Sequence, residues 1–198
     1  MEKLSIVYVD DDFESGLERY LDVEYTNPDY EKVYSEIKFN PDDGYESLIR
    51  NPYVQSANII FIDSKLFTNG TVTAGKFTGE EFKIILKKYY PFIEVIVITQ
   101  NEPDIEMGTI SKFNSQSGKS PTEYYTECLP IHIEKAIKNL KIYRNIADKL
   151  QENNNWEEAL KEKILNSLNG VGIYDELTKT DIDNLISAFK EIQEKIDD

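Results

Sequence analysis

The feature that most constrains this chain is an uninterrupted apolar run, Ile-Ile-Phe-Ile at residues 59–62, which ends directly in Asp63. Four branched and aromatic residues without apolar/polar alternation are typical of a strand that is covered on both faces, as in the parallel sheets of α/β proteins. In such open sheets, ligands bind beyond the carboxyl ends of the strands. Asp63 is therefore a candidate site residue from its position alone.

Four other segments have the composition of strands, and helical patterns separate most of them. We expect these strands at residues 4–9, 33–39, 93–98 and 108–113, of which the second is the weakest pattern. Apolar spacing predicts helices at residues 13–25, around residues 45–49, from 78 to 90 and from 120 onward. Strands that alternate with helices predict a parallel α/β sheet.

Two connections and one helix start have distinctive sequences. Residues 65–77 contain two glycines and several threonines and asparagines, so we expect a loop over the site there. The link at residues 100–107 leaves little room for a helix before the last strand. Ser120 and Glu123 have capping-box spacing with a proline between them, which predicts a helix start, and we expect that helix to restart at Pro130.

The charge balance narrows the class of partner. The 198 residues include 22 Lys and Arg against 37 Asp and Glu, which gives a formal net charge of -15. This charge repels the phosphates of nucleic acids and of anionic membranes, so we expect neither as a partner. The single cysteine forms no internal disulfide, no basic leader precedes the first strand, and no apolar run reaches the roughly 20 residues of a membrane span. We therefore expect a cytoplasmic protein.

Polar groups stand at the carboxyl ends of the expected strands. Asp10 and Asp11 follow the first strand, Asp63 the third and Thr99 the fourth, while Lys112 lies in the fifth. In this order and on these strands, the motifs Val-Asp-Asp, Phe-Ile-Asp, Ile-Val-Ile-Thr and Ile-Ser-Lys resemble those of response-regulator receiver domains, the CheY-like superfamily. The resemblance covers residues 1 to about 150.

This resemblance implies a flavodoxin-like, doubly wound sheet of five parallel strands, with Asp63 as the phosphoacceptor. It also implies a Mg²⁺ ion held by Asp11 and Asp63, with Asp10 acting through water and the backbone carbonyl of Lys65 as a further ligand. An all-oxygen donor set of this kind suits Mg²⁺. The ion offsets the negative charge of the carboxylate and of the phosphoryl group.

By the same resemblance, Thr99 hydrogen-bonds one phosphoryl oxygen and Lys112 pairs with another. The phosphoryl group then comes from a histidine kinase or a phosphotransfer protein, and the output is contact with a downstream protein. The resemblance implies no catalysis beyond self-phosphorylation and self-dephosphorylation of Asp63.

Several residues depart from the pattern of the family. Phe113 follows Lys112 where receivers usually have proline, and Thr109 stands where they have a switch aromatic. Gln100 replaces the usual small residue, and its bulk narrows access to the phosphoacceptor. Lys119 is a second candidate for the site lysine, but it lies in a loop beyond the strand and ranks below Lys112. Because of these departures, the resemblance does not imply that this chain contacts its downstream partner through the same surface that receivers usually use.

Residues 151–198 are expected to form an α-helical hairpin that is appended to the receiver-like domain of residues 1–150. An asparagine run at residues 153–155 marks the boundary. The segment contains 5 lysines, no arginine and 12 acids, so it has the wrong charge to read DNA. Its apolar stripes predict packing against the helix at residues 130–150, either of the same chain or of a second copy in a homodimer.

Two other functions fit parts of the pattern. A binding module would keep the receiver fold without being phosphorylated. A phosphatase of the haloacid dehalogenase type would use Asp10 and Thr99, but it leaves Asp63 without a role and lacks an acid pair after a later strand. Cys128 and His132 have no ligand partners at metal spacing, so we assign them no chemistry.

Overall fold

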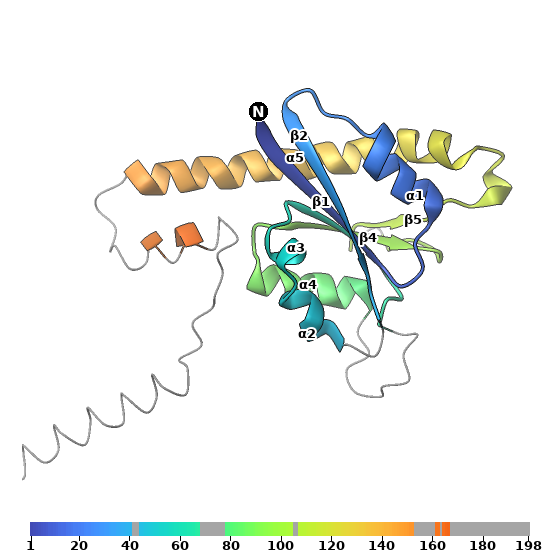
Figure 1. The fold of residues 1–198 in the computed structure, drawn as a ribbon, viewed down its shortest axis with the longest axis horizontal. Helices are drawn as coiled ribbons and strands as arrows, with labels where there is room; N and C mark the ends of the chain where they lie inside the picture. Colours follow the sequence, from blue (N-terminus) through green and yellow to red (C-terminus); the bar gives the residue numbers. More distant parts are fainter. Residues whose placement is uncertain (41–43, 68–77, 105–106, 153–160, 163, 167–198) are drawn as a thin grey trace, which may run out of the picture.

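The computed structural model describes residues 1–40, 44–67, 78–104, 107–152, 161–162 and 164–166 (Figure 1). The elements, in chain order, are β1 (Glu2–Asp10), α1 (Ser15–Arg19), η1 (Tyr20–Glu24), β2 (Tyr30–Lys38), α2 (Gly44–Ile49), α3 (Pro52–Gln55), β3 (Ile59–Asp63), α4 (Gly79–Tyr89), β4 (Glu94–Thr99), β5 (Thr109–Ser111), η3 (Ser115–Ser117) and α5 (Pro121–Glu152).

The five strands of the described sheet are parallel and lie in the order β2-β1-β3-β4-β5. The chain moves outward from β1 to β2 and then returns to β3 on the other side of β1, so the direction of winding reverses between β1 and β3. This is the flavodoxin-like strand order, and it confirms the predicted fold class. Ligands bind at such a reversal, beyond the carboxyl ends of the strands.

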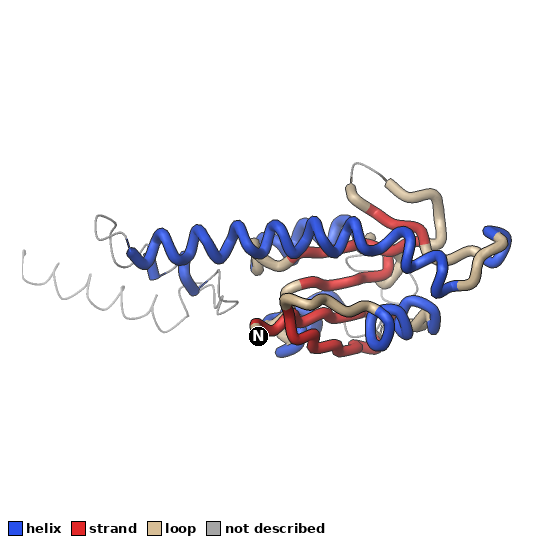
Figure 2. Tube along the Cα trace, turned by 90° about the horizontal axis from the view of Figure 1, so that it is seen from above, coloured by secondary structure: helices blue, strands red, loops and turns tan. Residues whose placement is uncertain are grey.

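Helices cover both faces of this sheet. Helices α1, η1 and α5 pack on one face, in a core that includes Leu17, Tyr125 and Ile133, and Figure 2 shows the long α5 lying along this face. Helices α2, α3 and α4 belong to the core on the opposite face, which includes Leu48 and Phe82. Because both faces are covered, every residue of β3 is buried, which explains its continuous apolar run.

Helix α4 begins at a capping box and lies beside the end of β3. The Thr78 side chain accepts the N–H of Glu81 at 3.2 Å, and the Glu81 carboxylate accepts the N–H of Thr78 at 2.9 Å. These bonds satisfy backbone donors that a helix start leaves unpaired. The N–H of Gly79 donates to the carbonyl of Ser64 at 2.7 Å, so the first turn of α4 is attached to the residue after Asp63.

Two elements of the first half differ in extent from the prediction. Strand β2 begins at Tyr30, earlier than expected, because it pairs along the whole length of β1, with Glu2 opposite Tyr30. The helix predicted at residues 13–25 is divided into the short α1 and the π-helical η1. Lys32 of β2 donates to three backbone carbonyls of residues 21, 22 and 25, and these bonds satisfy acceptors that the end of η1 leaves unpaired.

The expectation that a helix restarts at Pro130 is wrong, because α5 runs from Pro121 to Glu152 with this proline inside it. An internal proline removes one helical hydrogen bond and favours a kink. Leu129 and Ile133, on either side of the proline, are fully buried against the sheet. Their packing stabilises the helix across the proline.

The link from β4 to β5 is short for a parallel connection, which ordinarily contains a helix. Its described residues, 100–104 and 107–108, form no helix, as predicted. Two side chains of α4 reach toward β5 instead. Lys83 Nζ donates to the carbonyl of Met107 at 2.9 Å, and Glu80 accepts the Thr109 hydroxyl at 3.2 Å. Helix α4 therefore holds the sheet edge that a crossover helix usually covers.

Two predicted segments lie wholly or largely outside the described residues. They are the hairpin at residues 151–198 and, from residue 68 on, the loop at residues 65–77. Near the end of α5, Lys161 Nζ donates to the carbonyl of Gln151 at 2.9 Å. The domain boundary and the hairpin stay predictions. Among the described helices, none combines the length and the apolar character needed to cross a bilayer.

Candidate functional site

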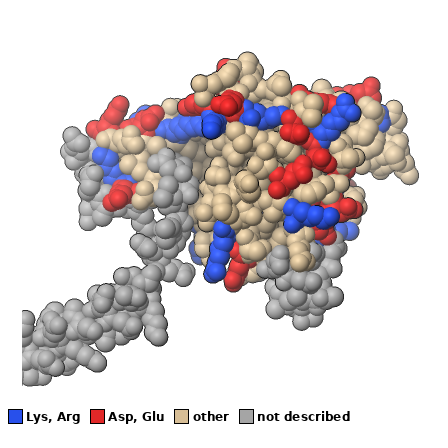
Figure 3. Space-filling view, in the orientation of Figure 1, with Lys and Arg blue, Asp and Glu red and all other residues tan. Residues whose placement is uncertain are grey.

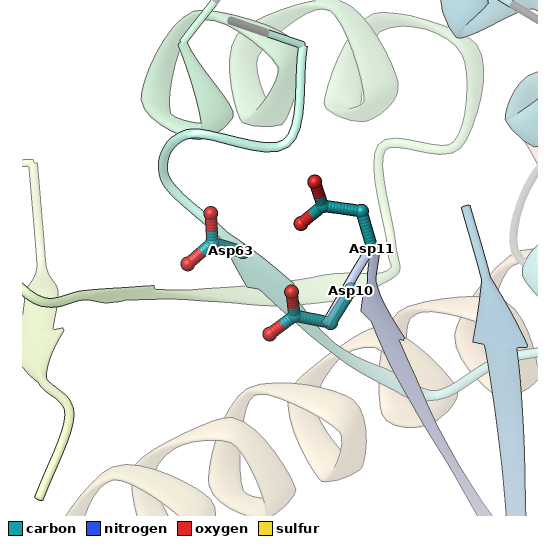
Figure 4. A group of neighbouring side chains, drawn as sticks. All are labelled: Asp10, Asp11 and Asp63. Atoms are coloured by element: carbon teal, nitrogen blue, oxygen red, sulfur yellow. The ribbon is translucent and has the colours of Figure 1, made fainter. Parts of the chain in front are cut away.

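Three carboxylates meet at the point where the winding of the sheet reverses. Asp10 ends β1, Asp11 follows it, and Asp63 ends the adjacent β3 (Figure 4). Each offers an oxygen that lies within 4.8 Å of those of the other two. Asp10 is 1% exposed and Asp63 is 7% exposed, whereas Asp11 is partly exposed. The strand order therefore brings together three acids that lie up to 53 residues apart in the chain.

Lys112 lies between two of these acids. Its Nζ is 2.8 Å from Asp10 Oδ2 and 2.8 Å from Asp63 Oδ1, and its side chain is buried. Its backbone N–H donates to the carbonyl of Thr99 at 2.6 Å, which continues the pairing of β5 with β4. Lys119, by contrast, pairs with Glu127 on the surface of α5. Of the two candidate lysines, the structure brings Lys112 to the carboxylates.

Burial and charge act in opposite directions on the ionisation of this site. Burial raises the pKa of Asp63 above its usual range, and the hydrogen bond and charge of Lys112 offset part of that rise. Burial by itself lowers the pKa of Lys112, but its bonds to Asp10 and Asp63 outweigh this effect, so the net shift of its pKa is upward. Lys112 therefore stays an ammonium at neutral pH.

Hydrogen bonds fix the orientation of the carboxylates of Asp10 and Asp63. Asp10 Oδ2 accepts the Tyr8 hydroxyl at 2.6 Å as well as Lys112, and Asp10 Oδ1 accepts the N–H of Asp12 at 3.1 Å. Asp63 Oδ2 accepts the N–H of Lys65 at 2.7 Å. Both acids are thus hydrogen-bonded on both oxygens, as buried carboxylates require.

These residues fit a divalent cation. The carboxylates open onto a cavity of about 340 Å³. Its lining residues are Asp10, Asp11, Asp12, Asp63, Lys65, Gln100 and Lys112. Three carboxylates and one ammonium leave two negative charges, which a divalent ion would neutralise. The donors are hard oxygens, which Mg²⁺ prefers. Lys65 lines the same cavity, and the role predicted for its carbonyl stays a prediction.

The end of β4 presents Gln100 to the cavity more directly than Thr99. Thr99 is 3% exposed, and its hydroxyl oxygen accepts the N–H of Asn101 at 3.1 Å. Gln100 is exposed and lines the cavity, and the narrowing of access to Asp63 by its side chain stays a prediction. The Thr99 hydroxyl keeps its own proton for donation, because in this bond it acts as the acceptor.

Three residues that shape the site were not identified from the sequence. Tyr8 hydrogen-bonds Asp10, Gly79 packs on the backbone of Asp63, and Glu80 accepts the Ser64 hydroxyl. For Tyr8, strand alternation predicts only that its side chain projects to the same face as that of Asp10, and does not predict the hydrogen bond between them. The other two contacts depend on how α4 docks on β3.

Comparisons with known proteins give a likeness of fold. Neither a family model nor a curated protein matches the sequence. One similar solved structure is a two component transcriptional regulator AraC from Clostridium phytofermentans ISDg, with 15% identity and a TM-score of 0.39 over 73% of this chain and 98% of that one. Another is the RcsB response regulator of Salmonella typhimurium, with 15% identity and a TM-score of 0.38 over 85% and 93%.

The strand order found here is the one that receiver domains share. At 15% identity, the likeness to these two proteins does not extend to what they bind.

Proposed function

We propose that this chain is a phosphoacceptor receiver of two-component signalling, which accepts a phosphoryl group on Asp63 and acts through contact with another protein. The observation that supports this most is the placement of Lys112. A buried ammonium stands 2.8 Å from the carboxylate of Asp63, inside a group of acids that would repel one another without a cation. Such a site is suited to an added phosphoryl group, because its positive charges then have a new anionic partner.

In the proposed reaction, an Asp63 carboxylate oxygen attacks the phosphorus of a phosphohistidine or of a small phosphodonor. The new O–P bond forms as the bond from phosphorus to the donor's nitrogen breaks, and the electron pair leaves with that nitrogen. Lys112 pairs with one phosphoryl oxygen, and the Thr99 hydroxyl donates to another. Water later cleaves the carboxyl phosphate and restores Asp63.

The residues that would hold Mg²⁺ are Asp11 and Asp63, with Asp10 through water and the carbonyl of Lys65. When bound, the ion supplies positive charge that offsets the carboxylate and the phosphoryl group. The protein's own contribution is to keep Asp10 turned toward Lys112 and to keep Asp63 at the cavity.

The same bonds argue against a phosphatase in which Asp10 is the nucleophile. Asp10 is 1% exposed and accepts hydrogen bonds from Tyr8, Lys112 and the backbone of Asp12. Asp63 is 7% exposed and has one hydrogen-bond donor on each oxygen, so it is the less enclosed of the two carboxylates. A nucleophile needs an oxygen that can reach the substrate. The unphosphorylated binding module remains the second candidate, and the position of Gln100 in the cavity favours it.

The partners we propose are a histidine kinase or phosphotransfer protein and a downstream protein, in the cytoplasm. Figure 3 shows Lys and Arg interspersed with Asp and Glu on the face in view, without a continuous basic area. Together with the net charge of -15, this supports protein partners over nucleic acid.

Intact-mass measurement after incubation with Mg²⁺ and phosphoramidate tests the proposal. We expect one added phosphoryl group on the parent protein and none on Asp63→Asn. Asp22→Asn, which changes an exposed acid of η1, is the matched control and should be labelled like the parent. An unlabelled parent would favour the binding module, whereas catalytic turnover of the donor that is lost in Asp10→Asn would favour the phosphatase.

A further inference from the structure

Tyr8 is a buried tyrosine whose hydroxyl touches the site. It lies on β1, two residues before Asp10, and its side chain is 0% exposed. The hydroxyl donates to Asp10 Oδ2 at 2.6 Å and accepts the N–H of Glu14 at 3.3 Å. The ring of Phe13 packs edge-on against the Tyr8 ring, with centroids 5.2 Å apart. Strand, ring contact and backbone N–H together hold the hydroxyl in place.

The Tyr8 hydroxyl decides which way the charge of Asp10 faces. Asp10 Oδ2 accepts from Tyr8 and from Lys112, so both donors fix the same oxygen. The hydroxyl accepts the N–H of Glu14, so its own proton is the one that Asp10 Oδ2 accepts. A fixed donor on Oδ2 keeps the carboxylate in the rotamer that meets the lysine.

A second buried tyrosine links the backbone just after β5, where Lys112 lies, to the same network. Tyr125 of α5 is 0% exposed. Its hydroxyl donates to the carboxylate of Glu14 and accepts the N–H of Phe113 at 3.0 Å. Phe113 directly follows Lys112, and the N–H of Glu14 donates to Tyr8. The hydrogen bonds thus run from Asp10 through Tyr8, Glu14 and Tyr125 to the backbone of the residue after Lys112.

We propose that Tyr8 is a positioning residue, which holds Asp10 as the counter-ion of Lys112 and so leaves Asp11 and Asp63 to hold the cation. The importance of Tyr8 for phosphorylation rests on the proposed function, but its hydrogen bond to Asp10, the partner of Lys112, does not. The two acids of the pair then have different tasks. Asp10, with its oxygens taken by three donors, orients the lysine, and Asp11, which is less buried, faces the cavity.

A double-mutant cycle on the metal-free protein tests the positioning itself. If Tyr8 acts through Asp10, the effect of the double variant Tyr8→Phe, Lys112→Met on the unfolding equilibrium constant should differ by about tenfold from the product of the two single effects. The same cycle in an Asp10→Asn background should be additive. Tyr34→Phe removes another tyrosine hydroxyl that donates to a carboxylate, that of Glu36 at 2.9 Å, and it should not couple to Lys112→Met. If the effects of Tyr8→Phe and Lys112→Met were additive in the protein that retains Asp10, the proposal would be overturned.

Phosphorylation kinetics test the consequence. With saturating Mg²⁺ and phosphoramidate, we expect Tyr8→Phe to be labelled on the order of tenfold more slowly than the parent, while its Mg²⁺ affinity changes by less than about twofold. In Asp10→Asn, the added Tyr8→Phe should have no further effect on the rate. Labelling of Tyr8→Phe at the parental rate would overturn the inference. An unlabelled parent would instead overturn the proposed function and leave the metal-free cycle to decide the role of Tyr8.

Discussion

Gly79 lies so close to the backbone of Asp63 that a Cβ atom on Gly79 would be 2.6 Å from the Asp63 carbonyl oxygen. It would also be 2.8 Å from the Cα of Ser64, and the N–H of Gly79 already donates to the Ser64 carbonyl at 2.7 Å. Only glycine allows the start of α4 to dock at this distance. Strand β3 and helix α4 are therefore in direct backbone contact at Asp63 and Ser64.

Gly79→Ala should lower the free energy of unfolding by about 1–3 kcal/mol, because the added methyl group meets backbone that cannot rotate away. Urea denaturation measures this. Lys88→Ala changes an exposed residue of the same helix and should stay within about 0.5 kcal/mol of the parent. A Gly79→Ala protein as stable as the parent would show that α4 can move away from β3 at little cost.

Glu80 connects the residue after Asp63 with β5. Its carboxylate accepts the Ser64 hydroxyl at 2.8 Å and the Thr109 hydroxyl at 3.2 Å. Glu80→Gln should lower the free energy of unfolding by about 1 kcal/mol, because an amide offers one acceptor oxygen in place of two. In a Thr109→Val background the loss should be smaller, since one donor is already gone. Equal losses in both backgrounds, measured by urea denaturation, would mean that the two bonds are independent.

The stability of the metal-free protein should depend on pH through Asp63. The folded-state pKa of Asp63 is raised, so the folded protein binds this proton more tightly than the unfolded chain. Its contribution to stability is therefore full below the unfolded pKa of about 3.9 and is lost as the pH rises through the folded pKa. As the pH rises from about 3.9 through the folded-state pKa of Asp63, the free energy of unfolding of the parent should fall relative to that of Asp63→Asn. Asp22→Asn should show the same pH dependence as the parent. A constant difference between parent and Asp63→Asn would contradict the raised pKa.

Mg²⁺ should stabilise the protein and depend on Asp11. At a concentration one hundred times its Kd, a ligand that binds only the folded state raises the free energy of unfolding by about 2.7 kcal/mol. Asp11→Asn should weaken Mg²⁺ binding by at least about tenfold in calorimetric titration, since even outer-shell partners of metal sites contribute that much. Asp12→Asn is the control, because Asp12 lines the cavity outside the group of three carboxylates. Unchanged affinity in Asp11→Asn would remove Asp11 from the metal site.

Thr99→Ala should keep the fold and the affinity for Mg²⁺ but weaken the response to beryllofluoride, an analogue of the phosphoryl group, by about tenfold. The reason is the loss of the hydroxyl proton, which Thr99 keeps available while it accepts the N–H of Asn101. Thr99→Ser retains the hydroxyl and should respond like the parent. Fluorescence or NMR titration can follow the response. An alanine variant that responds as strongly as the serine variant would exclude Thr99 from the site.

The fold could be predicted because its strands are buried on both faces and end in polar groups. Residues 59–62 are apolar without alternation for that reason. The helices could be predicted from the spacing of their apolar residues. The division of residues 13–25 was not predictable, because the π-helical turn is held by Lys32 from β2. The continuity of α5 through Pro130 likewise depends on packing against the sheet.

Lys112 ranks above Lys119 already in the sequence, because Lys119 lies in a loop beyond the expected strand. What the sequence does not give is the distance of 2.8 Å between Lys112 Nζ and Asp63 Oδ1, which depends on the pairing of β5 with β4. Tyr8 was overlooked because it reads as an ordinary apolar position of a buried strand. A hydrogen bond at the tip of an aromatic side chain leaves no trace in hydrophobic periodicity.

Pro130 divides α5 into two unequal arms. The short arm carries Tyr125, which hydrogen-bonds Glu14 and the residue after Lys112. The long arm runs from the proline to Glu152, and at 1.5 Å per residue it measures about 33 Å. A bend of about 5° at the proline, where one hydrogen bond of the helix is missing, would carry its far end through about 3 Å. Ile133 and Leu140 of the long arm are packed in the core, so such a bend would move core side chains together with Glu152.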